Sequence, residues 1–138
     1  MNAYETKGVD QRNAAYLEMA QIIKDNTEST DKISSYWNWD EMYLLSERES
    51  ASKYSYQSAA ILDHQVYYDY VQDLIDNNAK IVTVMLHHFH FGTFGGYWHD
   101  SEFKTFLDER YTEIWRGSDK DANEYAVYKL KDEFWINS

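Results

Sequence analysis

Residues 80–91 read KIVTVMLHHFHF and contain the longest aliphatic run of the chain, from Ile81 to Leu86. The β-branched and aromatic side chains suit a pleated, buried strand, and the FGTFGG sequence at 91–96 is typical of a turn. We therefore expect a strand near residues 81–91. A buried helix is the alternative, because the apolar residues of this stretch also fit a 3.6-residue period.

A strand at this position needs a partner for its backbone hydrogen-bonding groups. The sequence EYAVYKLK at 124–131 supplies a candidate, since its side chains alternate between two faces over Tyr125 to Lys131. We expect the two strands to pair in an antiparallel sheet.

Helical periodicity predicts three amphipathic helices, over about 10–24, 54–77 and from Asp100 or Ser101 to about 115, with Gly117 just past the last one. A weaker helical pattern begins at Ser29 or Thr30 and includes Ile33, Tyr36 and Leu44. A short strand competes with it, because Trp37 and Trp39 alternate with polar neighbours.

The chain has 138 residues, of which 43% are hydrophobic, and it contains no Pro-rich or Gly-rich linker and no repeat. We expect one domain over 1–138 with an α+β fold, in which three or four helices pack on a small antiparallel sheet. The alternative is an all-α arrangement.

Charge narrows the class of partner. The chain has 13 basic and 24 acidic residues, a formal net charge of −11 and no Cys. Binding to nucleic acid or to an anionic membrane through a general basic field is therefore disfavoured, and a charged partner should be a basic protein. Thiolate metal sites and disulfides are excluded. With no long apolar segment, we expect a cytoplasmic protein.

Four of the five histidines lie within residues 87–99. On a strand, His88 and His90 share a face, and His99 or Asp100 would supply a third ligand for zinc or iron. A His-x-His pair lacks the spacing of an established metal motif, so we expect histidines with structural roles, and neither a metal nor another cofactor. Motifs for a nucleophilic serine, a phosphate-binding loop and a dinucleotide fingerprint are absent.

The acidic residues are unevenly distributed. Between Lys53 and Lys80 the chain has four aspartates and no Lys or Arg. On a helix, three of the four fall within about 60° of one another, opposite the apolar face. Tyr70 falls between the acidic and apolar arcs, and Tyr68 is a second candidate aromatic contact. The expected partner-binding residues are Asp63, Asp69, Tyr70, Asp73 and Asp76.

These observations favour a small acidic inhibitor that occupies the basic groove of a nucleic-acid-handling protein. In composition the chain resembles the acidic proteins with which phages and mobile elements block restriction, CRISPR or repair enzymes, and also toxin-neutralising immunity proteins. The alternatives are a small His/Asp metal-dependent enzyme and an assembly protein. An acidic face that only keeps the domain soluble is equally consistent with the charge pattern.

Overall fold

The computed structural model describes residues 14–36, 41–54, 63–86, 98–118 and 124–135. Strand β3 (Ile81–Met85) lies at the centre of a five-stranded sheet, and all five of its side chains are buried. It pairs antiparallel with β5 (Glu124–Leu130), with Ile81 opposite Lys129 and Val84 opposite Ala126. This pairing confirms the predicted strand pair; the part of the first predicted strand from 87 to 91 lies outside the described residues.

The sheet has the strand order β2-β1-β3-β5-β4. Strands β1 (Lys32–Tyr36) and β2 (Glu49–Ser50) run parallel to β3, whereas β5 and the edge strand β4 (Tyr111–Ser118) form an antiparallel hairpin. The sheet is therefore mixed, and not purely antiparallel as we expected. The α+β class is confirmed, and an all-α fold is not supported.

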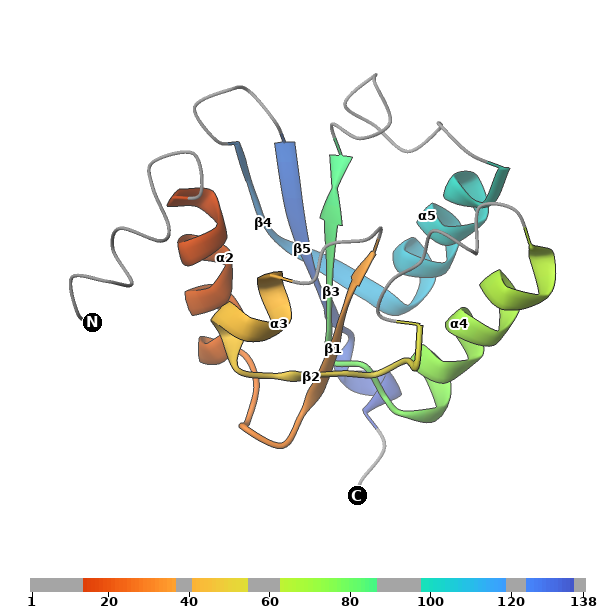
Figure 1. The fold of residues 1–138 in the computed structure, drawn as a ribbon, viewed down its shortest axis with the longest axis horizontal. Coiled ribbons are helices and arrows are strands. Elements are labelled where there is room, and N and C mark those ends of the chain that lie inside the picture. The colour runs from red at the N-terminus through yellow and green to blue at the C-terminus, as the bar shows by residue number, and fades with distance from the viewer. Residues whose placement is uncertain (1–13, 37–40, 55–62, 87–97, 119–123, 136–138) are drawn as a thin grey trace.

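Helices cover both faces of the sheet (Figure 1). Helices α2 (Ala14–Asp25) and α3 (Glu41–Ser46) pack on one face, and α4 (His64–Asp76) and α5 (Trp98–Arg110) on the other. A short 3-10 helix, η4 (Asp132–Phe134), follows β5. The alternating side chains of β3 serve both layers, because Ile81 and Met85 join the α2/α3 core whereas Val82 and Val84 join the α4/α5 core. Burial on both faces explains the continuous apolar run in the sequence.

The first predicted helix is confirmed as α2. Within the predicted segment 54–77, α4 begins at His64, and residues 55–62 lie outside the described part of the chain. Both helices place their apolar residues toward the sheet, which is the basis of the periodicity that predicted them.

The weaker helix predicted from residue 29 or 30 is wrong in its first half, where the chain forms β1. Ile33 and Tyr36 pack into different cores, on opposite faces of the sheet. The buried Ser35 hydroxyl accepts a hydrogen bond of 2.8 Å from Thr83 on β3. The observed strand precedes the one predicted around Trp37 and Trp39, which lie outside the described residues, and α3 begins only at Glu41.

The helix predicted to reach residue 115 ends at Arg110, and β4 begins at Tyr111. Tyr111 continues the spacing of Phe103 and Leu107, but its buried hydroxyl donates to the Ala79 carbonyl, 2.8 Å away. Gly117 does not terminate a helix. A Cβ atom there would lie 2.5 Å from the Trp115 ring, so the glycine leaves room for the indole.

Candidate protein-binding surface on helices α4 and α5

Asp63 is the N-cap of α4. Its carboxylate accepts hydrogen bonds from the backbone N–H groups of Gln65 at 2.8 Å and Val66 at 3.2 Å. These groups would otherwise lack a partner in the first turn. Asp63 therefore has a local structural role, which the sequence analysis missed when it assigned this residue to a partner.

Asp73 joins α4 to the segment that follows β2. One of its oxygens accepts from the Ser52 hydroxyl at 2.8 Å and lies 3.6 Å from Lys53 Nζ. Nearby, the Asn77 side-chain amide donates to the Ala51 carbonyl at 2.7 Å. Although α4 itself contains no Lys or Arg, Lys53 therefore offsets the charge of Asp73 from outside the helix.

Asp69 and Asp76 are the two predicted acids that remain available on the surface. Each accepts a hydrogen bond of 2.8 Å from the glutamine four residues earlier, Gln65 for Asp69 and Gln72 for Asp76. Among the described residues, no Lys or Arg lies within ion-pair distance of either carboxylate. Both negative charges are therefore unneutralised by the described part of the chain.

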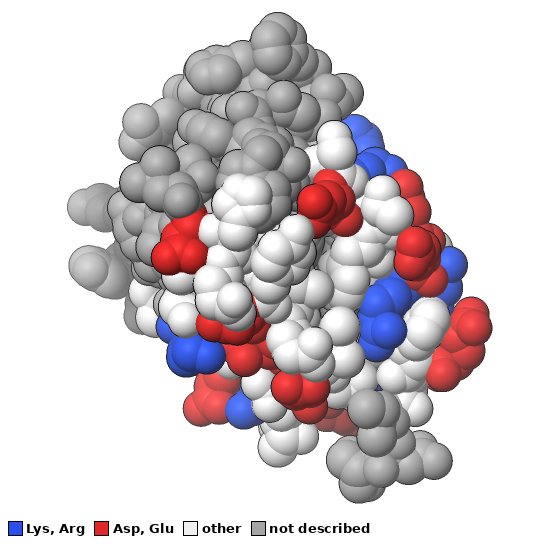
Figure 2. All heavy atoms as spheres, turned by 90° about the vertical axis from the view of Figure 1, so that its right-hand side faces the viewer, with Lys and Arg blue, Asp and Glu red and all other residues white. Residues whose placement is uncertain are grey.

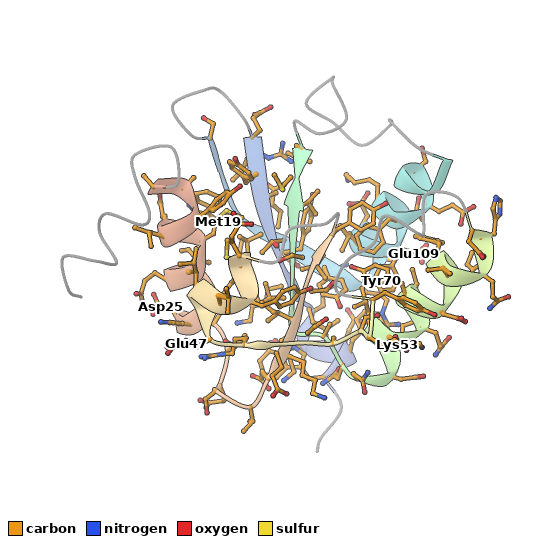
Figure 3. The ribbon with its side chains drawn as sticks, viewed as in Figure 1. Met19, Asp25, Glu47, Lys53, Tyr70 and Glu109 are labelled. Carbon is orange, nitrogen blue, oxygen red and sulfur yellow. The ribbon has the colours of Figure 1, made fainter. Side chains whose placement is uncertain are left out.

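Tyr70 is fully buried and makes no surface contact, contrary to the prediction (Figure 3). The spacing of Tyr67, Tyr70 and Leu74 places all three on the face of α4 that packs on the sheet. The Tyr70 hydroxyl is hydrogen-bonded to the buried Ser34 hydroxyl of β1. Burial raises the pKa of Tyr70 well above its ordinary value.

The exposed aromatic residue of α4 is Tyr68, whose side chain is 47% exposed. Its hydroxyl donates to Glu102 of α5 across 3.2 Å. Desolvation and the Glu102 carboxylate both raise the pKa of Tyr68. Glu102 could not be identified from the sequence, because only the packing of α5 beside α4 brings it to Tyr68.

We call Tyr68, Asp69, Asp76 and Glu102 the acidic face. At 100° per residue its three α4 members fall within about 100° of one another, on the side away from the sheet. Figure 2 shows that carboxylates on this side of the molecule are separated by uncharged side chains. The surface is therefore a set of spaced negative charges beside a tyrosine. Of the three aspartates predicted to form a stripe on this helix, only Asp69 and Asp76 belong to it, because Asp73 is bound by Ser52 and Lys53.

The predicted metal ligands are not assembled within the described residues. His88 and His90 lie outside them, and the backbone places His99 and Asp100 in the first turn of α5. Within the part of the chain that the structure describes, no group of three or more His, Asp or Glu side chains could hold a metal ion.

Comparisons with family models, with curated proteins and with solved structures gave no match. In the described ranges, no helix is long and apolar enough to cross a membrane.

Proposed function

We propose that the protein is an inhibitor that binds a basic, nucleic-acid-handling protein through the acidic face. The observation that carries the proposal is the Tyr68–Glu102 hydrogen bond, which holds an exposed tyrosine beside Asp69 and Asp76, two carboxylates that no described Lys or Arg neutralises. In this role the protein acts in the cytoplasm, that of the host cell if a phage encodes it.

Two physical effects support the mechanism. The formal charge of −11 attracts a basic surface over a distance set by the ionic strength, which accelerates encounter. Tyrosine then provides a large contact area at low entropic cost, and exposed tyrosines are frequent anchors of protein interfaces. A carboxylate surface on the nucleic-acid groove of the partner excludes the phosphates that normally bind there, so inhibition is competitive.

The test replaces Tyr68 with photoreactive benzoylphenylalanine and cross-links the protein in its source cells. Leu44 on α3 is the matched control site, because it is 79% exposed and lies in the opposite helix layer. We expect the Tyr68 site to capture a basic nucleic-acid-binding protein, identified by mass spectrometry, that the Leu44 site does not capture. The captured protein should then lose affinity for nucleic acid when the unmodified inhibitor is added.

Two outcomes contradict the proposal. Equal capture from both sites would show that the acidic face is not the specific partner contact. A captured protein with no basic surface would show that electrostatic attraction does not drive binding. A nuclease toxin as the captured protein would retain the mechanism and identify the inhibitor as an immunity protein.

A second candidate function is a metal-dependent enzyme, for which the sheet topology provides a position where ligands commonly bind. Strands β1 and β3 are adjacent and parallel, and the helices that follow them, α3 and α5, lie on opposite faces of the sheet. In open sheets with this arrangement, ligands bind at the carboxyl ends of the two strands. His88 and His90 follow β3 in the sequence and lie outside the described residues. Metal analysis of untagged protein decides: about one equivalent of zinc or iron supports this function, and less than about a tenth of an equivalent removes it.

A further inference from the structure

Basic residues form a row across one end of the sheet, although the protein is acidic overall. Backbone hydrogen bonds of 2.9 Å connect Lys80 to Lys32, Leu130 to Lys80, and Lys131 to Arg110. Adjacent strands are about 4.8 Å apart, so these positions lie in a line across β1, β3, β5 and the start of β4. The basic row consists of Lys32, Lys80, Arg110, Lys129 and Lys131.

Most of the row lacks carboxylate partners. Among the described residues, only Lys80 of the row has a carboxylate within ion-pair distance, that of Asp31 at 3.7 Å. Elsewhere in the described ranges, Lys24, Lys53, Lys104 and Arg116 each have an acidic partner, and Arg48 donates to Thr27 and to backbone carbonyls. Although the chain has almost two acids for each base, four of the five residues of the row have no carboxylate within ion-pair distance in the described part of the chain.

The local contacts hold the row in place without neutralising it. Lys129 Nζ donates to the Asn26 side chain at 3.2 Å, and Lys131 Nζ donates to the Asp108 and Glu109 carbonyls at the end of α5. The Trp135 ring lies 3.9 Å from Lys80 Nζ and 5.5 Å from Lys129 Nζ. These partners are dipoles and an aromatic ring, so the formal positive charges remain.

A shallow pocket of about 240 Å³ opens beside the row. Two lysines, a threonine, two aliphatic residues and one aspartate border it. Its lining residues are Thr112, Ile114, Lys129, Leu130, Lys131 and Asp132. The volume is below the range of about 300–1,000 Å³ that is usual for drug-sized ligands, so the occupant should be small.

We infer that this pocket binds the phosphate group of a small hydroxylated phosphomonoester. Lysine ammonium groups bind phosphate as point charges, and the Thr112 hydroxyl is an additional donor. Asp132 also borders the pocket; its carboxylate disfavours a bare anion but can accept a hydrogen bond from a hydroxyl on the same ligand. Nucleic acid is a poorer occupant, because a polyanion meets the net charge of −11 over its whole length.

The test is an NMR titration of the full chain with ribose 5-phosphate, followed by the amide signals of Thr112 and Lys131. We expect saturable shifts with a Kd on the order of 1 mM or lower, and weaker binding of inorganic phosphate and of ribose. Binding should strengthen from pH 5 to pH 7, because the second pKa of a phosphomonoester is about 6.

Two variants make the result specific. Lys129→Gln combined with Lys131→Gln should weaken binding at least about tenfold, whereas the control Lys24→Gln with Lys53→Gln should leave it unchanged. If loss of the Lys131 contacts to α5 unfolds the protein, Thr112→Val on the exposed edge strand tests the pocket alone and should also weaken binding. Absence of saturable shifts, equal binding by the lysine variant, or tighter binding of a single-stranded oligonucleotide would each overturn the inference.

Discussion

The Tyr68 hydroxyl lies 3.2 Å from Glu102 and joins the exposed surfaces of α4 and α5. Each of the two residues is exposed, so the hydrogen bond itself contributes little stability. Its consequence is positional, since it fixes an aromatic ring beside acidic groups. The acidic face therefore crosses from one helix to the other.

Neutralising Asp73 should destabilise the protein more than neutralising Asp76. Asp73→Asn weakens the hydrogen bond from Ser52 and the ion pair with Lys53, and it should lower the free energy of unfolding by about 1 kcal/mol. Asp76→Asn is the matched control and should change it by less than about 0.5 kcal/mol. Urea unfolding measures both, and equal effects would show that Asp73 has no structural role.

Tyr70→Phe tests the corrected position of this residue. The substitution leaves the buried Ser34 hydroxyl without its partner, so the free energy of unfolding should fall by about 1–3 kcal/mol. Binding of a partner to the acidic face should be unchanged in the folded variant. If Tyr70→Phe weakened partner binding without lowering the free energy of unfolding, Tyr70 would be part of the interface after all.

Gly117→Ala should disturb the packing of Trp115. The added methyl group meets the indole ring at 2.5 Å and pushes it away from Glu18, which accepts its Nε1–H at 3.1 Å. We expect a loss of about 1–3 kcal/mol in unfolding free energy and a shift of the Trp115 indole N–H signal in the NMR spectrum. Ser118→Ala, at the adjacent exposed position, is the control and should leave that signal in place.

Alkaline pH should destabilise the fold through its buried tyrosines. Burial, together with the Glu113 carboxylate, raises the pKa of Tyr128 to about 12, and burial also raises the pKa values of Tyr70 and Tyr111. Because these groups ionise near pH 10 in the unfolded chain, the unfolded state releases protons first and stability falls as the pH rises above about 10. Urea unfolding at pH 9 to 11.5 measures the slope, which should be smaller for Tyr128→Phe. An unchanged slope in that variant would contradict the assignment to Tyr128.

Hydrophobic periodicity and β-branched composition predicted the strands and helices whose formation depends on residues close together in the sequence. The β-branched run that forms β3, its pairing with β5, and the apolar faces of α2 and α4 were all visible in the sequence. The spacing of Phe103, Leu107 and Tyr111 was misleading, because residues of a helix and of the strand after it pack into the same core.

The candidate site depended more on contacts between distant residues. The acidic character of α4 followed from the sequence. Asp73 is not available to a partner, however, because Ser52 and Lys53, in the segment after β2, bind its carboxylate. Likewise, the burial of Tyr70 depends on Ser34, and the position of Glu102 depends on the packing of α5. No periodicity within one element contains this information.

The most direct test of the proposed function is the affinity of the captured partner for two variants of equal charge. The acidic-face variant carries Asp69→Asn, Asp76→Asn and Glu102→Gln. The control variant carries Asp25→Asn, Glu41→Gln and Glu49→Gln, on α2, α3 and β2. Asp25 matches Asp69, because each accepts a hydrogen bond from the glutamine four residues earlier. The acidic-face variant should bind at least about tenfold more weakly, a loss of about 1.4 kcal/mol, and its affinity should depend less on salt. The control should bind within about twofold of the native protein. Equal weakening in both variants would show that only the net charge matters, and unchanged binding in the first would contradict the acidic face as the interface.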